Sequence, residues 1–438
     1  MRAMKDSGIK WIGEIPEEWE VKRIKSVFDR RNEVNNPILS KERLSLSIDV
    51  GITKYSDKTT NLDRFKEDFT KYQLAYPNDI VLNSMNMIVG AVGKSEFFGC
   101  VSPVYYVITT KDGNYASFYA YLLNTLSIRE VYHSLGRGIY AIERGEGRVN
   151  TCRLKVPYYD FSSILIPVPP LSEQQRIATY LDTKCGEIDQ LIGIQEKFIE
   201  ELKAYKQSVI TEAVTKGLNP NATLKDSGVE WIGEIPEEWE VCRIKNYFSI
   251  NSGTTPQSDK TEYWGEDYYW VTPADFKTED KYIAKGKRSL SKLGFESCSL
   301  TIYPKGSLIF SKRAPIGQIV IASNELCVNQ GCFGCTPLRA TNSSYFYFLL
   351  SIYKTQFELY GSGTTFKEIS AISFKNFKIA CPKDLSEQQS IATYLDNKCS
   401  QIDSLITLKQ SKIEELKSFK KSLIYEYVTG KKTVPENV

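Results

Sequence analysis

The residue types that most often perform catalysis or bind metal ions are scarce in this sequence. His133 is the only histidine, so a two-histidine metal site is excluded and a Ser-His-Asp or Cys-His arrangement would need that one residue. No GxxxxGK[ST] phosphate loop occurs. Cys332 and Cys335, with Cys327 nearby, have half the spacing of a zinc site, but no second ligand pair accompanies them. The pattern favours buried thiols on adjacent strands and a protein that binds rather than catalyses.

Clustered basic residues offer a different chemistry, which is contact with phosphate groups. The segment from Lys277 to Arg313 contains nine Lys or Arg residues and three Asp or Glu residues. The segment from Arg129 to Lys155 contains six Lys or Arg residues and three Asp or Glu residues. The net charge of the whole chain is only +3, so it does not by itself indicate a nucleic-acid partner. The local clusters suit phosphate contacts, with a few side chains reaching base edges. An ordinary solvated surface is the alternative for any single residue.

Two blocks of sequence recur along the chain. Lys5 to Phe28 returns as Lys225 to Phe248, with 19 of 24 residues identical, and Leu171 to Gly186 returns as Leu385 to Ser400, with 13 of 16 identical. The segments between the blocks, 29–170 and 249–384, share almost no alignable sequence. The chain is therefore a tandem duplication of a domain-sized unit, in which one scaffold carries two different inserts.

The second block of each half opens a long helix. Two prolines precede Ser172, which we expect to cap the helix in a capping box with Gln175. Apolar residues then recur in steps of three and four, as in a heptad seam, and the second copy keeps the same register. The predicted pairing residues are Ile188, Leu191, Leu202, Tyr205 and Val209 on the first helix and Ile402, Leu405, Leu416, Phe419 and Leu423 on the second.

Neither helix can bury its seam alone, so we expect the two to pair antiparallel about a pseudo-two-fold axis. The alternative is that each helix packs only on its own globular region. The inserts contain short β-rich runs such as 79–83 and 306–310 and helical stretches at 116–126 and 344–353. The predicted fold class is α/β (α+β), with two mixed domains separated by a coiled coil. The expected boundaries are 1–170, 171–218, 219–384 and 385–438.

The repeated blocks carry a family resemblance. WIGEIPEEWEV opens each half, and LSEQQ-x-IATYLD-x-K opens each long helix. In this combination the blocks strongly resemble the DNA-specificity (S) subunit of type I restriction-modification systems, also called the HsdS family, over essentially the whole chain. The resemblance implies two target-recognition domains, each reading one half of a bipartite double-stranded DNA sequence. It also implies that the helices dock methyltransferase (M) subunits and that restriction (R) subunits complete the complex.

This resemblance implies that the chain is a non-catalytic subunit without a cofactor of its own. S-adenosylmethionine, ATP and Mg²⁺ would be bound by the partner subunits. The residues expected to contact DNA are Arg137, Arg144, Arg148, Arg153, Lys281, Lys285, Lys287, Arg288, Lys292, Lys312 and Arg313.

Two other classes of protein remain as alternatives. One is a coiled-coil scaffold that binds proteins through two globular arms; retention on duplex DNA that depends on salt would argue against it. The other is a nuclease or methyltransferase built around His133. The sequence shows no apolar run of about eighteen residues and no signal peptide, so we expect a cytoplasmic protein without a membrane partner.

Overall fold

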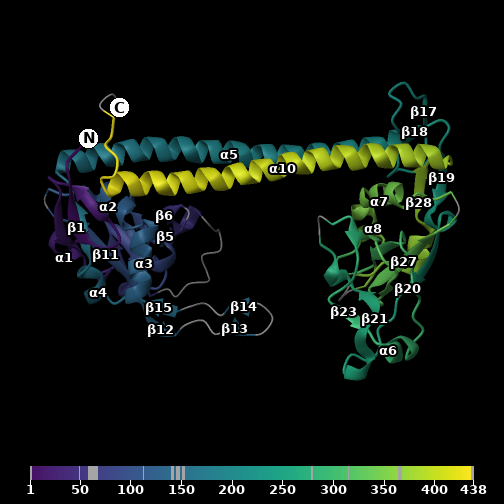
Figure 1. Ribbon diagram of the computed structural model, residues 1–438, viewed down its shortest axis with the longest axis horizontal. Coiled ribbons are helices and arrows are strands. Elements are labelled where there is room, and N and C mark those ends of the chain that lie inside the picture. Colours follow the sequence, from purple (N-terminus) through teal and green to yellow (C-terminus); the bar gives the residue numbers. More distant parts are fainter. Residues whose placement is uncertain are drawn as a thin grey trace. The chain divides into compact units, whose positions relative to one another are not determined.

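The computed structural model describes residues 2–48, 50–57, 68–111, 113–139, 143–144, 148–149, 153–277, 280–313, 315–338, 340–363 and 367–435. The chain forms two compact units, Met1–Glu196 with Ser411–Val438 and Lys197–Gln410. Two long helices, α5 (Leu171–Lys216) and α10 (Leu385–Val428), each contribute residues to both units (Figure 1). The expected boundaries gave each helix a segment of its own, whereas here each helix is shared.

The first unit is built around a four-stranded antiparallel sheet with the strand order β4-β11-β8-β9. These strands are β4 (Phe28–Arg30), β11 (Tyr105–Thr110), β8 (Ile80–Asn83) and β9 (Val92–Lys94). Smaller antiparallel pairs are β5 (Leu44–Ser47) with β6 (Gly51–Lys54), β7 (Gln73–Ala75) with β10 (Gly99–Val101), β12 (Arg137–Ile139) with β15 (Arg153–Lys155), and β13 (Glu143–Arg144) with β14 (Arg148–Val149).

Helices and turns complete the first unit. They are α1 (Ile24–Val27), α2 (Ala116–Leu122), α3 (Leu126–Leu135), α4 (Tyr158–Ser162), and the 3-10 turns η1 (Tyr55–Asp57), η3 (Phe69–Lys71) and η4 (Met87–Val89). Aromatic and apolar residues of α2 and α3, including Phe118 and Tyr132, are fully buried against the sheet residues Ile80 and Ile108. The core of this unit therefore lies between the sheet and these helices.

The second unit contains two sheets. A five-stranded sheet has the order β20-β27-β24-β25-β22, and a three-stranded sheet has the order β23-β21-β26. The strands are β20 (Phe248–Ser252), β27 (Cys332–Pro337), β24 (Leu308–Ser311), β25 (Ile319–Ala322), β22 (Tyr282–Ile283), β23 (Arg288–Leu290), β21 (Trp264–Val271) and β26 (Cys327–Val328). The helices and turns are α6 (Lys292–Glu296), α7 (Ser343–Ser351), α8 (Lys354–Leu359), α9 (Ala371–Asn376), η5 (Ile244–Asn246), η6 (Thr261–Tyr263) and η7 (Pro273–Asp275).

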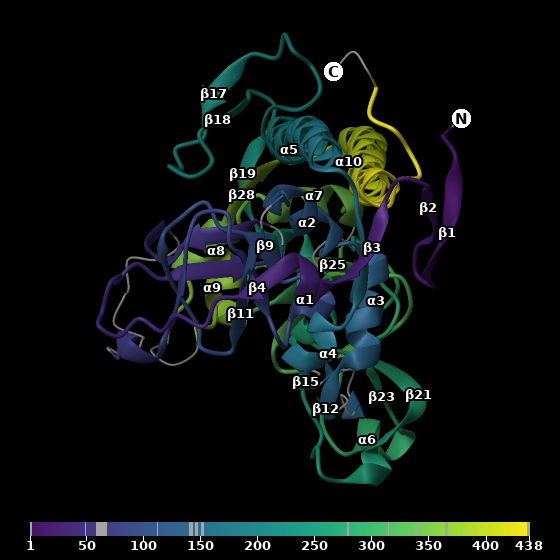
Figure 2. The ribbon, with the colours of Figure 1, turned by 90° about the vertical axis from the view of Figure 1, so that its left-hand side faces the viewer.

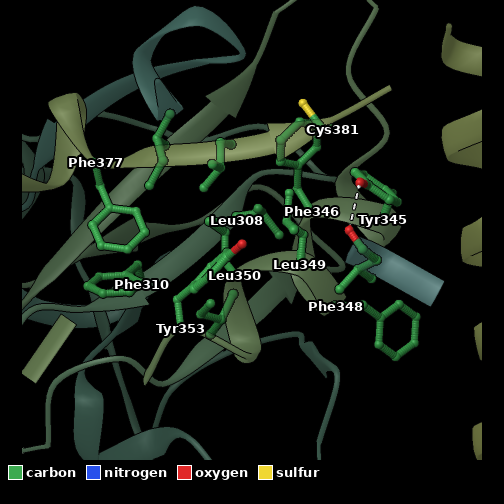
Figure 3. Close-up of a cluster of buried hydrophobic side chains, with 14 of the residues drawn as sticks. Leu308, Phe310, Tyr345, Phe346, Phe348, Leu349, Leu350, Tyr353, Phe377 and Cys381 are labelled. Atoms are coloured by element: carbon green, nitrogen blue, oxygen red, sulfur yellow. Dashed lines mark hydrogen bonds between the residues drawn. The ribbon is translucent and has the colours of Figure 1, made fainter. Parts of the chain in front are cut away.

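The largest hydrophobic core of the second unit joins its sheet, its helices and the end of α5. Figure 3 shows Phe310 of β24 and Phe377 in the same cluster as the α7 side chains Phe346 and Leu349. The hydroxyl of Tyr345, also on α7, donates a hydrogen bond to the backbone carbonyl of Val214 on α5 at 3.5 Å. All these residues are buried. The last turns of α5 are therefore part of this domain's core rather than a detached linker.

The repeated blocks form the same frame in each unit. β1 (Met4–Ile9) pairs with β2 (Gly13–Pro16), and β17 (Leu224–Asp226) pairs with β18 (Glu234–Pro236). β3 (Glu20–Arg23) pairs with β16 (Leu165–Val168), and β19 (Glu240–Arg243) pairs with β28 (Lys378–Cys381). Both pairs are antiparallel. Two stretches that are far apart in each half are thus brought together by strand pairing.

A buried tryptophan joins the first repeated block to the second. The indole Nε1 of Trp19 donates to Glu173 at 2.8 Å, and that of Trp239 donates to Glu387 at 3.0 Å. Both indoles are almost completely buried, so each N–H needs this partner. We call these contacts the Trp–Glu frame. It explains in physical terms why EEWEV and LSEQQ recur together.

The beginning of each long helix corrects one expectation. α5 begins at Leu171, and the amide of Gln174 donates to the carbonyl of Pro170 at 3.0 Å. Ser172 is therefore already inside the first turn and does not act as the N-cap. At the start of α10 the carboxylate of Asp384 accepts the amide of Ser386 at 3.0 Å. The capping position is two residues earlier than the Ser-x-x-Gln pattern suggested.

Gln174 anchors the start of α5 to the globular part of its unit. Its side chain is fully buried, accepts the amide of Tyr115 at 2.8 Å, and donates to the carbonyl of Pro169 at 2.8 Å. Gln388 repeats the arrangement with Asn342 and Pro382. Tyr115 and Asn342 stand directly before α2 and α7. One amide side chain therefore ties the beginnings of two helices together in each unit.

Replacing Gln174 by Ala should destabilise the first unit by about 2–4 kcal/mol, because it leaves a buried N–H and a buried carbonyl without partners. The neighbouring Gln175 is exposed and provides a matched control, since Gln175→Ala should change stability by less than about 0.5 kcal/mol. Urea unfolding of the two variants measures the difference. Equal midpoints for Gln174→Ala, Gln175→Ala and the unmodified chain would show that Gln174 has no anchoring role.

α5 and α10 lie side by side in both views (Figures 1 and 2), and the colours of Figure 1 show that they run antiparallel. The first unit shows this in the contact between the hydroxyls of Tyr180 and Tyr427, and in the ion pair between Asp189 and Lys420. The second unit shows it in the cation–π contact of Lys409 with Phe198 and in the ion pair of Lys206 with Asp403. Among the described residues no helix is both long enough and apolar enough to cross a membrane.

The pairing face has heptad spacing, and part of the predicted seam lies in it. The predicted residues that are buried or half-buried there are Ile188, Leu202 and Val209 on α5 and Ile402, Leu416 and Leu423 on α10. Ile199 and Ile413, both almost completely buried, also belong to this face.

The remaining predicted pairing residues lie beside the seam. Leu191, Tyr205, Leu405 and Phe419 are 46–56% exposed. In each of these four cases the next residue along the helix lies in the seam instead. In two cases that next residue is a lysine. Lys206 reaches Asp403 at 2.7 Å and Lys420 reaches Asp189 at 2.6 Å. Their aliphatic stems can cover apolar surface while the ammonium groups pair at the edge, which allows a charged residue in this position.

Candidate nucleic-acid interface

A basic surface of the second unit lies around β23 and α6. Lys285, Lys287, Arg288 and Lys292 are all exposed, and we call these four residues the exposed basic cluster. The strand β23 is held by antiparallel pairing with β21. Ser291 caps α6 by accepting the amide of Gly294 at 3.1 Å. A short, capped strand–helix turn therefore carries the four cationic side chains.

Carboxylates hold the backbone of this turn. The amide of Lys287 donates to Asp275 at 2.9 Å, and the amide of Lys292 donates to Asp267 at 2.8 Å. The guanidinium of Arg288 lies 3.3 Å from the ring centroid of Trp264. Because the two aspartates bind main-chain groups, the lysine side chains remain directed to solvent. The arrangement can present positive charge to a phosphate backbone from a fixed position.

Three other predicted DNA-contacting residues of this unit do not belong to the exposed basic cluster. Lys281 is only 16% exposed, forms an ion pair with Asp396 of α10, and lies 4.5 Å from the ring of Phe348. Lys312 is 12% exposed and pairs with Glu368 at 2.8 Å. Arg313 is 3.7 Å from the same carboxylate. Lys281 therefore serves the packing of α10 against its domain, and Lys312 and Arg313 form a separate, partly neutralised group.

In the first unit, the predicted arginines lie on two small strand pairs. Arg137 on β12 is 74% exposed and pairs with Asp160 of α4 at 2.7 Å. Arg153 on β15 faces Ile139 of β12 across the ladder. Arg144 and Arg148 face each other across β13 and β14. The side chains of Arg144, Arg148 and Arg153 lie outside the described residues, so only their backbone positions are assigned here.

Sequence reasoning missed Arg30, which is exposed at the end of β4. Its guanidinium lies 4.5 Å from the ring of Tyr158 and 5.3 Å from that of Tyr106. Its neighbour Arg31 instead binds the buried carboxylate of Asp79 with two hydrogen bonds of 2.7 and 3.1 Å, and the Asp79 contact raises the pKa of Arg31. The adjacent arginines thus have different roles, which their sequence position alone does not reveal.

The residues first considered for chemistry are placed as ordinary structural groups. His133 lies exposed in the last turn of α3. Cys327 on β26 and Cys332 and Cys335 on β27 are buried, although the two strands belong to different sheets. Burial raises the pKa of Cys327 to about 12, which makes it a poor nucleophile. Among the described residues no group of three or more His, Cys, Asp or Glu side chains could hold a metal ion.

A cavity of about 380 Å³ lies beside the three-stranded sheet of the second unit. Asp267, Asn324 and Glu325 are among its lining residues. Carboxylates repel phosphate, so this cavity does not suit contact with a nucleic-acid backbone. The exposed basic cluster is the better candidate for that contact.

Comparison with known proteins places this geometry in a family. The model of the type I restriction modification DNA specificity domain matches the chain twice, at residues 16–204 and 236–418. Each match contains one Trp–Glu frame. The chain therefore belongs to the type I restriction-modification DNA specificity family, and DNA-target recognition within such a system is its function.

Individual relatives agree with this assignment. The MjaVIII specificity subunit of Methanocaldococcus jannaschii, a type I restriction enzyme subunit, is 26% identical over 95% of this chain and 93% of its own length. The MjaIX specificity subunit of the same organism is 38% identical over 41% of each chain. A solved chain from work on complex assembly of the type I R-M system has a TM-score of 0.72 and 18% identity, covering 95% of this chain and 99% of that one. The last likeness supports the fold.

Proposed function

We propose that each recognition domain reads one half of an asymmetric, bipartite double-stranded DNA target. The observation that carries this proposal is the combination of a duplicated frame with unlike inserts. The Trp–Glu frame occurs in both units, whereas the central sheets differ in strand number and order. Two equivalent supports with different reading surfaces suit two unlike half-sites. Identical half-sites would instead favour two copies of one insert.

We infer that methyltransferase subunits dock on the long helices. Four large apolar side chains of α5 are about half exposed, and three of their counterparts 214 residues later are also apolar and exposed. The residues are Leu191, Ile194, Phe198 and Tyr205 on α5 and Leu405, Leu408 and Phe419 on α10. An apolar stripe of this kind is costly in water and is typical of an interface. Its duplication suits two copies of one partner subunit.

Catalysis is assigned in this proposal to the partners. Methyl transfer with S-adenosylmethionine would belong to the methyltransferase subunits, and ATP- and Mg²⁺-dependent cleavage would belong to restriction subunits. The support is the description of the relatives as specificity subunits. A target of intracellular duplex DNA also implies a cytoplasmic location.

Reconstitution tests this division of roles. Methyl transfer to DNA should require both this chain and its methyltransferase partner, and neither protein alone should show it. The measurement is incorporation of labelled methyl groups from S-adenosylmethionine into duplex DNA. Methyl transfer by the isolated chain would contradict a non-catalytic role.

A further inference from the structure

The short helices α4 and α9 occupy equivalent places in the two recognition domains. The amide of Ile24 donates to the carbonyl of Ile164, and the amide of Ile244 donates to that of Phe377. Within the helices, the amides of Phe161 and Phe374 bond the carbonyls of Pro157 and Ser370. Phe374, Ser370 and Phe377 each stand 213 positions after their counterparts Phe161, Pro157 and Ile164. By the same offset, Tyr159 corresponds to Ile372.

Tyr159 and Ile372 project into solvent from these equivalent positions. They are 78% and 76% exposed, among the most exposed large apolar side chains of the described residues. The residue two places later in each helix, Phe161 or Phe374, is completely buried and packs among aromatic rings. Each helix is therefore fixed to its core by a phenylalanine and holds a protruding apolar side chain beside it. An exposed side chain at one position is unremarkable, but its recurrence in otherwise different inserts requires an explanation.

Both helices lie close to segments that carry basic residues. Asp160, which follows Tyr159, pairs with Arg137, and Arg30 stacks on Tyr158. In the second unit, the amide of Ile369, three residues before Ile372, donates to the carbonyl of Lys312 at 3.0 Å. Lys312 and Arg313 share the carboxylate of Glu368 in the same place.

A DNA surface matches this combination. Its phosphates attract the arginines and lysines, and its bases offer apolar edges and faces that an exposed Tyr or Ile can contact. A partner protein would also cover apolar surface, but it gives no reason for cationic groups beside each of the two side chains.

We propose that Tyr159 and Ile372 are apolar base-contacting residues, each acting in the half-site read by its own domain. This inference rests on the proposed bipartite recognition and names two residues that take part in it. Basic residues such as the exposed basic cluster would position the duplex, while Tyr159 and Ile372 would contribute to the discrimination between bases.

The test uses the complex of the full chain with its methyltransferase partner. Dissociation constants are measured for the cognate duplex and for duplexes with either half-site scrambled. Tyr159→Ser should weaken cognate binding about 10-fold and reduce the penalty for scrambling the first domain's half-site by a similar factor. The penalty for scrambling the other half-site should stay unchanged. Ile372→Ser should give the mirror-image result.

Four control variants separate base contact from other causes. Tyr159→Phe and Ile372→Leu keep the apolar surface and should bind within about threefold of the unmodified complex. Leu126→Ser and Leu359→Ser remove exposed apolar side chains outside the duplicated position and should have no half-site-specific effect.

Three outcomes would overturn the inference. They are unchanged DNA binding by both serine variants, equal losses for both half-sites, and failure of these variants to assemble with the methyltransferase in gel filtration. If the unmodified complex itself preferred no bipartite sequence, the proposed function would fail first. A preference that survived both serine substitutions would leave that function intact and contradict only the role of Tyr159 and Ile372.

Discussion

Neutralising the exposed basic cluster should weaken DNA binding by about 10²- to 10³-fold at 0.15 M salt. The logarithm of the binding constant falls linearly with the logarithm of the salt concentration, and each phosphate contact makes this slope steeper by about 0.9. The loss of four contacts should therefore make the slope shallower by about 3–4. The variant replaces Lys285, Lys287, Arg288 and Lys292 by Gln, and all four residues are exposed. Because substitutions of exposed residues change stability little, the variant should remain folded. Binding is measured between about 0.05 and 0.3 M salt, roughly a sixfold range, with the assembled complex.

The matched control removes four charges from another exposed surface of the same unit. Its residues are Lys225, Lys245, Lys378 and Lys383. These belong to or border the repeated frame and should leave the slope within about one unit. Equal slopes for the two quadruple variants would show that the exposed basic cluster does not contact phosphates. A salt-independent affinity of the unmodified complex would favour the alternative of a protein-binding scaffold.

Exchanging residues 249–384 for the corresponding insert of a relative should replace one half-site completely and leave the other unchanged. The exchange keeps Trp239 and Glu387, so the frame of the second unit is preserved. The affinity of a protein for its specific DNA site exceeds its affinity for non-specific DNA by about 10³-fold or more. The exchanged chain should therefore lose at least about 10³-fold of its preference for the original second half-site. The readout is the set of methylated sequences in a host that carries the exchanged chain.

This exchange tests whether the two domains read their half-sites independently. The inserted segment must fill the core that Figure 3 shows, including the contact of Tyr345 with the end of α5, so a donor with an aromatic residue there is preferable. A change in both half-sites would contradict independent reading. An exchange that altered neither half-site would place recognition outside the inserts.

The long helices and the repeats were predictable from sequence because their signals are long and periodic. The long helix predicted in segment 171–218 corresponds to α5 at Leu171–Lys216, and the predicted strand at 79–83 corresponds to β8. The exact seam was not predictable in the same way. An apolar repeat does not indicate Lys206 and Lys420 as seam residues, and their positions there depend on the ion pairs with Asp403 and Asp189.

The basic surface shows the same limit of sequence reasoning. Lys281 and Lys285 are four residues apart, but one pairs with Asp396 of α10 and the other is exposed. Which carboxylate a lysine meets depends on tertiary packing between segments more than a hundred residues apart. For the same reason, the Trp–Glu frame could be recognised as recurring sequence but not as a hydrogen bond. The equivalence of Tyr159 and Ile372 became visible only through the hydrogen-bond register of α4 and α9.

The most direct test of the central claim is to map every methylated position in the DNA of a host that expresses this chain with its methyltransferase partner. We expect one motif with two unlike half-sites, separated by bases that are not read. A perfect palindrome or a single contiguous block of specified bases would contradict it.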